Sequence, residues 1–329
     1  MRSPFIAAGL IALAQNAMAA DLPVLTVYTY DSFVSDWGPG PAVEAAFEAT
    51  CGCDLKFVAA GDGAALLARV QLEGPRTDAD VLLGIDTNLT AAAAATGLFA
   101  PHEKGAVSTD LPVEWTDETF LPFDWGYFAF VHNADLVGVP SNFRDLASSD
   151  LKLVIQDPRS STPGLGLLLW IKAAHGDNAE DLWSNLSDNI VTVTKGWSEA
   201  YGLFLEGEAD MVLSYTTSPA YHIVAEGDLT KKAAEFSEGH YMQIEVAGKL
   251  ASTDQSELAD AFLSFMMSET FQSIIPTTNW MYPAVMPDAG LPEGFDAASP
   301  TVTPLLYSAK EARELRDAAL QEWLNALSN

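Results

Sequence analysis

Basic side chains are scarce in this sequence. Its 329 residues include 16 Lys and Arg against 45 Asp and Glu, which gives a formal net charge of -29 at pH 7. Such an excess of negative charge repels nucleic-acid phosphates and anionic lipid headgroups. The composition therefore argues against a nucleic-acid partner and a peripheral membrane role, and it favours a cationic or neutral ligand.

Cysteine and histidine are also rare. The two cysteines, Cys51 and Cys53, are separated by one residue and can form a small local disulfide in an oxidising compartment. They supply only two of the three or four ligands that a zinc site requires, and none of the five histidines stands at a metal-binding helical spacing from another. We therefore expect no metal site.

Long apolar runs are missing after the first residues of the chain. No later segment approaches the roughly 20 apolar residues of a membrane span. The early run from Pro4 to Leu13 follows Arg2 and precedes Ala17-Met18-Ala19, a pattern typical of a cleavable signal peptide. A membrane anchor is the alternative, but the run is too short to span a bilayer. We predict that residues 1–19 are a signal peptide and that the mature protein is periplasmic.

The mature chain is longer than the roughly 250 residues at which single domains usually stop, which predicts two lobes. Strand patterns followed by helix patterns recur early in the chain, at 25–30, 55–60 and 79–86, and again at 151–157, 190–194 and 210–216. Alternating strands and helices predict an α/β fold with a mainly parallel sheet, flanked by helices, in each lobe. Two extended runs, 123–133 and 240–252, are candidates for strands that cross between the lobes.

We expect a first lobe from residues 20–126 plus about 245–285, a second lobe from 127–244, and a C-terminal segment from 286–329. Two capping-box spacings near the end of the chain, Asp254 with Glu257 and Ser308 with Glu311, predict helix starts. The last helix has apolar residues on one face, and we expect it to dock against the lobes.

Two segments of the second lobe place hydroxyl side chains directly before a proline at a predicted helix start. Ser161 and Thr162 precede Pro163, and Ser218 precedes Pro219. A helix start exposes unpaired N–H groups and the positive end of the helix dipole, which suit phosphate or another electron-rich group. Hydroxyls before proline are also ordinary N-caps, so the local pattern leaves both interpretations open.

Aromatic residues gather at the ends of predicted elements: Tyr30, Trp37, Trp197, Tyr215, Tyr221, Trp280 and Tyr282. Most Trp and Tyr residues pack in cores or at their rims. Together with Asp31 and Asp62 in similar positions, however, this set matches a flat organic cation, which stacks on π faces and approaches negative potential. The common motifs of serine hydrolases, P-loop enzymes and zinc proteases are missing, so we expect no catalytic residues.

Long, ordered motifs resemble one known family. They include VYTYDSFVSDWGPGP (27–41), FDWGYFAFV (123–131), IQDPRSSTPGLGLLLW (155–170), TVTKGWSEAYGLFLEGEAD (192–210), SYTTSPAYH (214–222), FSEGHY (236–241) and NWMYP (279–283). Over essentially the whole mature chain, the sequence closely resembles the periplasmic thiamine-binding proteins of bacterial ABC transporters. The resemblance implies a two-lobed type II periplasmic binding-protein fold whose lobes close on a ligand in the cleft between them.

The same resemblance implies a function. The protein would capture thiamine, with its mono- and diphosphate, and deliver it to an inner-membrane ABC permease driven by an ATPase. It would carry out no chemistry, need no cofactor and act as a monomer.

The family's motifs also carry over candidate ligand contacts. The resemblance places these in the cleft: Asp62, Gly63, Ser161, Thr162, Trp197, Tyr215, Thr216, Thr217, Ser218 and Trp280. The matched motifs also contain a second set of candidate ligand-binding residues: Tyr30, Asp31, Trp37, Tyr221 and Tyr282.

Two other functions stay open at this point. A thiaminase I-like enzyme has a similar fold but needs a free cysteine nucleophile, and the only thiols here are Cys51 and Cys53. A polyamine- or ferric-binding relative is the second alternative. Polyamine sites place carboxylates along a linear cation, and ferric sites use paired tyrosinate ligands, whereas no Tyr-Tyr pair occurs here.

Overall fold

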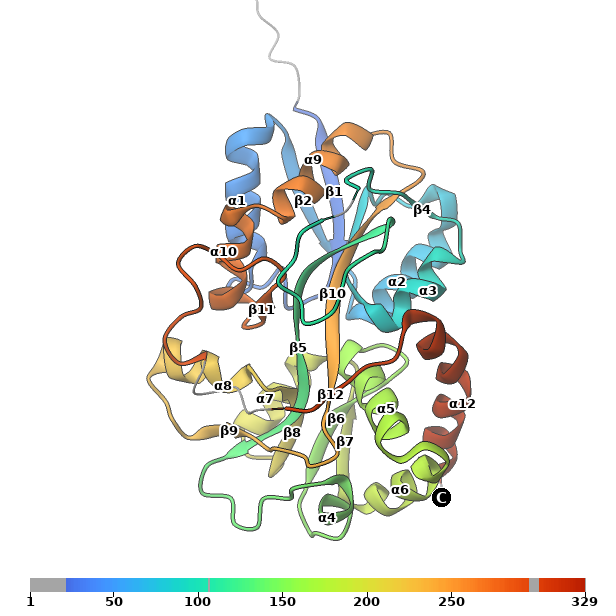
Figure 1. Ribbon diagram of the computed structural model, residues 1–329, viewed down its shortest axis with the longest axis vertical. Coiled ribbons are helices and arrows are strands. Elements are labelled where there is room, and N and C mark those ends of the chain that lie inside the picture. Colours follow the sequence, from blue (N-terminus) through green and yellow to red (C-terminus); the bar gives the residue numbers. More distant parts are fainter. Residues whose placement is uncertain (1–21, 106, 296–301, 329) are drawn as a thin grey trace, which may run out of the picture.

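Figure 1 shows the fold as a computed structural model that describes residues 22–105, 107–295 and 302–328. The predicted signal peptide, residues 1–19, lies outside the described residues. Within them, no helix combines the length and the apolar character that a membrane crossing requires.

The first part of the chain alternates strands and helices, as predicted. Its elements are β1 (Val24–Thr29), α1 (Gly40–Cys51), β2 (Asp54–Ala59), α2 (Gly63–Glu73), β3 (Val81–Asp86), α3 (Thr87–Ala94) and the short β4 (Phe99–Ala100). Strand β1 pairs in parallel with β2 on one side and with β3 on the other. All six residues of β3 are buried, which is typical of a strand that is covered on both faces.

Two long strands, β5 (Phe120–Asn133) and β10 (His240–Leu250), run antiparallel through both halves of the molecule (Figure 1). Strand β10 pairs with β3 of the first half and with β5. Along β5 the partner changes: residues up to Tyr127 pair with β10, and residues from Phe128 pair with β8 of the second half. These strands are therefore the crossing strands that the two extended runs predicted.

The second half repeats the α/β arrangement. Its elements are α4 (Phe143–Ala147), β6 (Leu153–Gln156), α5 (Thr162–His175), α6 (Ala179–Leu186), β7 (Ile190–Thr194), α7 (Trp197–Leu205), β8 (Met211–Tyr215), α8 (Ser218–Tyr221) and β9 (Lys231–Ala233). Strand β6 pairs in parallel with β7 and β8. The continuous strand order is β2-β1-β3-β10-β5-β8-β6-β7. The residue boundaries that we predicted for the two lobes remain predictions.

The buried apolar residues form one cluster within the first half and a larger cluster that runs from the first half into the second. Phe33, Phe47 and Phe262 belong to a buried cluster of the first half, which also includes residues of α9 (Ser256–Met266) and α10 (Glu269–Thr278). In the second half, Phe143 and Trp170 pack edge to face with their ring centroids 4.8 Å apart. Because this larger cluster also contains Leu82 of β3 and Phe120 of β5, the two halves share buried packing beside the crossing strands.

The start of α9 differs from the predicted one. The helix begins at Ser256 instead of Asp254, and its N-cap residue, Gln255, makes no side-chain capping bond. Just before the helix, the hydroxyl of Thr253 donates to Asp80 and accepts the backbone N–H of Gln255. The predicted capping box between Asp254 and Glu257 is therefore wrong, although a helix does begin two residues later.

The final helix, α12 (Ala309–Leu327), has the predicted capping box between Ser308 and Glu311. It packs against α3 of the first half and against α5 and α6 of the second (Figure 1). Arg313 donates to the carbonyl of Ala91 in α3, and Lys172 in α5 forms an ion pair with Glu322 at 2.6 Å. The predicted docking of the last helix is confirmed, and the helix joins both halves. The remaining short strands are β11 (Tyr282–Pro283) and β12 (Pro304–Leu305).

Candidate functional site

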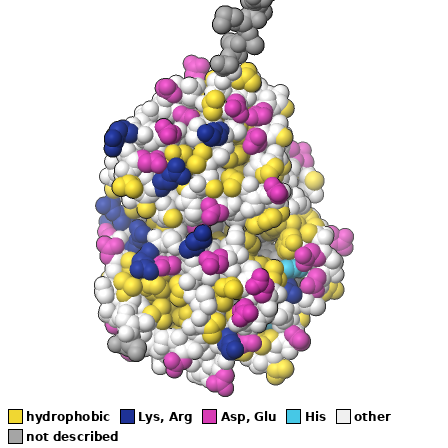
Figure 2. Space-filling model, turned by 180° about the vertical axis from the view of Figure 1, so that it is seen from behind, with side chains coloured by type: hydrophobic (Ala, Val, Ile, Leu, Met, Phe, Trp, Pro, Cys, Tyr) yellow, Lys and Arg dark blue, Asp and Glu magenta, His cyan; other side chains and the backbone are white. Residues whose placement is uncertain are grey.

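A cavity of about 290 Å³ lies between the two halves of the molecule. Both halves and the crossing strand β10 supply its lining: Tyr30, Ser32, Trp37, Asp62, Pro163, Trp197, Ser198, Tyr201, Gly202, Leu205, Tyr215, Ser218, Tyr221, Gln243, Glu245, Asn279, Trp280 and Met281. On the face shown in Figure 2, acidic side chains are scattered over both halves of the molecule. Seven of the 18 lining residues are aromatic and two are acidic, a combination that suits a flat cation.

Asp62 lies where three helices begin. It is the N-cap of α2, where its Oδ1 accepts the Gly63 N–H at 2.8 Å, and its Oδ2 accepts the hydroxyl of Ser161 at 2.7 Å. The backbone N–H groups of Thr162 in α5 and Trp197 in α7 also hydrogen-bond to this carboxylate. Burial raises the pKa of Asp62, and these hydrogen bonds oppose the increase. One carboxylate of the first half therefore satisfies helix starts of the second half.

The N-termini of α2 and α5 approach each other closely behind Asp62. A Cβ atom placed on Gly63 would lie 2.1 Å from the Thr162 hydroxyl oxygen, so this contact requires glycine. Thr162 Oγ1 is buried and has no hydrogen-bond partner among the described residues. Gly63, Ser161 and Thr162 thus stand behind Asp62, outside the cavity lining.

The aromatic wall comes from both halves. Trp197 stacks on Tyr201, with centroids 5.0 Å apart and planes at 24°, and its indole N–H donates to the Ser214 hydroxyl at 2.8 Å. Trp37 of the first half lies 6.2 Å from the Trp197 ring and is 53% exposed, which places it at the rim of the cavity. A ligand between these rings would be contacted from both lobes.

Trp280 reaches the cavity through an unusual backbone conformation. Its φ angle is +58°, in the left-handed region that a large L-residue rarely adopts. Its backbone N–H donates to the Ile275 carbonyl at the end of α10, and its ring meets the edge of Tyr221 at 5.2 Å. Strain of this kind costs on the order of 1–3 kcal/mol and commonly occurs at binding sites.

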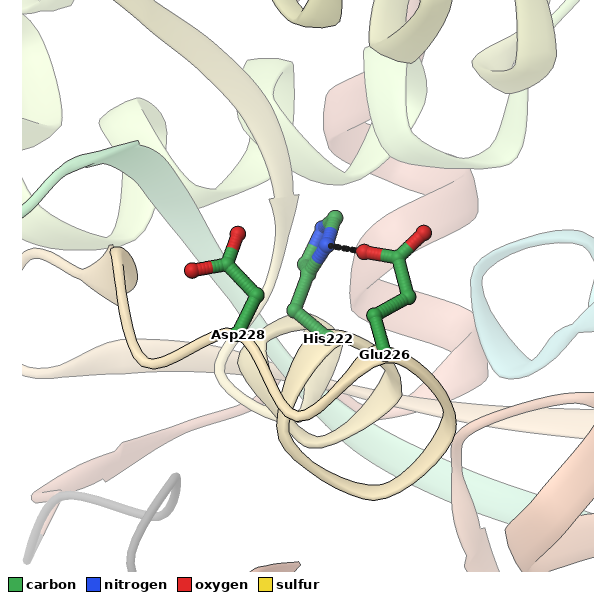
Figure 3. A group of neighbouring side chains, drawn as sticks. All are labelled: His222, Glu226 and Asp228. Atoms are coloured by element: carbon green, nitrogen blue, oxygen red, sulfur yellow. Dashed lines mark hydrogen bonds and ion pairs between the residues drawn. The ribbon is translucent and has the colours of Figure 1, made fainter.

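Two tyrosines of the aromatic wall are held by hydrogen bonds to Glu226, one directly and one through His222. Tyr221 donates its hydroxyl to Glu226 Oε1 at 3.0 Å, and the Tyr201 hydroxyl bonds to His222 Nε2 at 2.9 Å. His222 Nδ1 in turn bonds to Glu226 Oε2 at 2.7 Å, as Figure 3 shows. Both imidazole nitrogens therefore have partners, and the group fixes the positions of the aromatic rings.

Asp228 lies near this pair, and the three residues have potential metal-ligand atoms within 4.8 Å of one another. In Figure 3 the Asp228 side chain points away from the imidazole. It accepts hydrogen bonds from Thr230 and forms an ion pair with Lys231 at 3.5 Å. The sequence analysis missed His222 and Glu226, although their spacing of four residues could have indicated a pair on one helical face.

The floor of the cavity is polar. Tyr30 donates its hydroxyl to Glu245 Oε2 at 3.0 Å, and Asn279 donates to the Tyr30 oxygen and to Asp124. Burial is the main cause that raises the pKa of Asp124 to about 7, and burial together with the Asp124 charge raises the pKa of Glu245 well above its usual range. Sequence reasoning missed these residues, but polar side chains at alternate positions of HYMQIEVAG could have indicated a polar strip on one face of β10.

The predicted site residues divide into two groups. Those that line the cavity are Tyr30, Trp37, Asp62, Trp197, Tyr215, Ser218, Tyr221 and Trp280. The others lie outside the lining: Gly63, Ser161, Thr162, Thr216, Thr217, Asp31 and Tyr282. Asp31 caps the turn at Gly61, and the Tyr282 ring packs on Trp125 at 4.6 Å. Whether each residue contacts ligand remains a prediction.

The two cysteines form a disulfide bond, with an S–S distance of 2.01 Å, at the end of α1. Neither cysteine lines the cavity. Because these are the only cysteines of the chain, no thiol is free to act as a nucleophile.

Comparisons with known proteins agree with this architecture. Residues 35–273 match the model of the bacterial extracellular solute-binding protein family. The chain is 53% identical to the thiamine-binding periplasmic protein of Salmonella typhimurium over 309 residues, which are 93% of this chain and 94% of the relative. A solved structure of a periplasmic thiamin binding protein matches with a TM-score of 0.90 and 51% identity, and the match covers 94% of this chain and 97% of that one.

A more distant solved structure shows the same fold. A periplasmic binding protein from Actinobacillus pleuropneumoniae is 15% identical and matches with a TM-score of 0.78 over 93% of this chain and 99% of that one. The predicted two-lobed type II fold is thereby confirmed. The chain belongs to the bacterial extracellular solute-binding proteins and, among them, to the thiamine-binding periplasmic proteins.

Proposed function

We propose that this protein binds thiamine in the periplasm as the substrate-binding component of a transport system. The observation that carries the proposal is a cleft whose aromatic wall comes from both lobes and whose floor is acidic, in a chain 53% identical to a thiamine-binding protein. Thiamine carries a permanently cationic thiazolium ring and a flat aminopyrimidine. Aromatic faces attract such a cation, and nearby carboxylates add to the attraction.

Closure of the lobes explains how a membrane permease would recognise the protein that has bound its ligand. Trp37 of the first half lies 6.2 Å from Trp197 of the second half at the cavity, and beside the cavity Asp62 of the first half accepts the hydroxyl of Ser161 of the second. A ligand held between them stabilises the closed arrangement, because only that arrangement makes both sets of contacts. A membrane permease can then distinguish the loaded protein by its shape. We infer that the partners are an ABC permease and its ATPase, and that the binding protein acts as a monomer.

Thiamine mono- and diphosphate are proposed as further ligands. Support comes from the three helix starts that converge on Asp62, where the N–H groups of Thr162 and Trp197 point toward one acidic group. The N–H groups at the start of a helix bind a phosphate for the same reason that they bind a carboxylate, because both groups are anionic acceptors. A phosphate ester would then compete with Asp62 for these donors.

The proposal assigns the protein no catalytic step and no cofactor. A thiaminase I-like reaction needs an attacking thiolate, whereas both sulfur atoms of this chain are joined to each other. We also infer that residues 1–19 direct export and are then removed, which fits the periplasmic location of the relatives.

Isothermal titration of the mature, ligand-stripped protein with thiamine at pH 7 tests the proposal. Saturable binding near one to one, with the thiamine recovered intact, is the expected result. Binding of spermidine or ferric ion in place of thiamine would contradict it, and recovery of cleaved thiamine would make the protein an enzyme.

A further inference from the structure

Three carboxyl side chains lie in register across three neighbouring strands. Glu245 of β10 pairs with Asp86 of β3 on one side and with Asp124 of β5 on the other. Residues paired in this way project to the same face of a sheet, with Cβ atoms about 4.5–5.5 Å apart. All three are buried, with exposed fractions of 0% for Asp86 and Asp124 and 6% for Glu245.

No basic side chain neutralises this row directly. Among the described residues, no ion pair involves Asp86, Asp124 or Glu245. Arg316 of α12 acts on Asp86 only at longer range, and Asp86 also accepts a hydrogen bond from Asn88. Buried like charges at this spacing cannot all stay ionised without a compensating positive charge.

The groups that face Glu245 from the other elements add no positive charge. Tyr30 donates to it from the end of β1, Tyr215 faces it from β8, and Asp62 adds a further negative charge from the start of α2. Burial raises the pKa of both tyrosines, so both remain neutral. Glu245 is the member of the carboxyl row that lines the cavity.

An unused amide stands beside it. Gln243 precedes Glu245 by two residues on β10, so both side chains project to the same face. Gln243 is 1% exposed and lines the cavity, and neither its Nε2 nor its Oε1 has a hydrogen-bond partner among the described residues. Its strand neighbour is Gly126, which brings no side chain to occupy the amide. A buried amide with both polar atoms free is costly unless a ligand satisfies it.

We propose that Glu245 and Asp124 share a proton in the empty cleft and that a cationic ring of the ligand replaces this proton on binding, while the Gln243 amide hydrogen-bonds to the ligand. This inference rests on the proposed binding of thiamine. The step breaks one carboxyl O–H bond, passes the proton to solvent and leaves the second carboxylate paired with the positive ring. The net charge of the floor then stays the same, so the ligand enters without leaving a buried charge uncompensated.

The exchange has a measurable sign. In the pH range in which the empty protein holds the shared proton, binding releases up to one proton. The affinity for thiamine then rises with pH, by up to about tenfold for each pH unit. Above the range in which the pair titrates, release falls to zero and affinity becomes independent of pH. Titration calorimetry of the mature protein with thiamine from pH 5 to 8, in two buffers of different ionisation enthalpy, counts the released protons.

Variants locate the proton. Glu245→Gln should abolish the release and weaken thiamine binding at pH 7 by about tenfold or more. Asp124→Asn should reduce the release, because Glu245 then ionises without a neighbouring charge. The same substitutions at exposed carboxylates, Glu114→Gln and Asp188→Asn, should leave both the proton count and the affinity unchanged. Gln243→Met should weaken binding but keep the proton release.

The possible results distinguish a failure of the proton-exchange inference from a failure of the proposed thiamine binding. Thiamine binding without proton release anywhere from pH 5 to 8 overturns the inference alone, as does an unchanged release in Glu245→Gln. Unchanged affinity in Gln243→Met removes the amide from it. Absence of thiamine binding at every pH overturns the proposed function and the inference together. The proton count of the unaltered protein needs no variant, so the test does not depend on how a variant folds.

Discussion

Asp62 of the first lobe accepts the hydroxyl of Ser161 of the second lobe at 2.7 Å, across 99 residues of sequence. The bond lies where the starts of α2 and α5 meet, beside the cavity, so it forms only when the two lobes are close together. We regard it as part of the closed arrangement that a bound ligand stabilises.

Ser161→Ala removes this hydroxyl and should weaken thiamine binding by about 1–2 kcal/mol, because a hydrogen bond to a charged group is lost from the closed state. Titration calorimetry measures the change. Ser160→Ala is a matched control, since the Ser160 hydroxyl bonds to the Lys195 carbonyl within the second lobe. Equal losses in both variants would show that the bond between lobes has no special part in binding.

The double variant Ser161→Ala, Thr162→Ala should weaken thiamine diphosphate more than thiamine. The two hydroxyls stand at the start of α5, where phosphate is proposed to lie, and the thiamine rings are proposed to lie against the aromatic wall. Competition titrations with the two ligands give the ratio of affinities. A ratio that does not change from the unaltered protein would place the phosphate elsewhere.

Trp197→Ala should weaken thiamine binding by about 1–3 kcal/mol through the loss of a stacking face. Trp197→Phe keeps a ring at this position but loses the bond to Ser214, so it should lose less. Quenching of tryptophan fluorescence and calorimetry both report the affinity. Unaltered affinity in Trp197→Ala would exclude Trp197 from the site.

Glu226 should give the protein a pH-dependent stability. A hydrogen bond from His222 and a second from Tyr221 lower the pKa of Glu226. Burial raises this pKa by a smaller amount, so the net shift is downward. Because the folded-state pKa lies below the unfolded one, the stabilisation is complete above the unfolded value, about 4.3, and is lost as the pH falls through the folded value. Thermal unfolding between pH 6 and 3 should therefore show a smaller loss for Glu226→Gln than for the unaltered protein. Parallel losses would contradict this role.

Asp124→Asn should stabilise the ligand-free protein at pH 8 but not at pH 4. Burial raises the folded-state pKa of Asp124 to about 7, so the stability decreases as the pH rises from the unfolded value, about 3.9, through the folded one. Asparagine removes the buried charge and still accepts the bond from Asn279. The gain at pH 8 should be on the order of 1–3 kcal/mol, measured by denaturant unfolding. A pH-independent difference would show that charge is not the cause.

Local sequence patterns predicted much of the fold. The β-branched and aromatic residues of LTVYTY predicted β1, and the Ser308–Glu311 box predicted the start of α12, because both signals act between residues a few positions apart. The Asp254–Glu257 box was wrong: α9 begins at Ser256 and its N-cap residue is Gln255, and the nearby Thr253 bonds to Asp80 from a distant part of the chain. A local capping signal thus indicated that a helix begins nearby without fixing its first residue.

The candidate site was predicted only in part, and the reason is physical. Trp197, Tyr215 and Trp280 follow or begin predicted elements, and such positions commonly face a cleft in α/β folds. Glu245, Asp124 and Gln243 lie inside buried strands, where a sequence indicates a core residue and gives no register. Their significance depends on which strands are neighbours.

The sequence by itself determined the acidic surface, the alternation of strands and helices, and the helix starts before Pro163 and Pro219, since these depend on composition and on short-range chemistry. Only the tertiary structure decided that Asp62 meets Ser161 and that Glu245 stands between Asp86 and Asp124. Strand pairing brings together residues more than a hundred positions apart, and burial between those strands raises the pKa of carboxyls that would be ordinary in water.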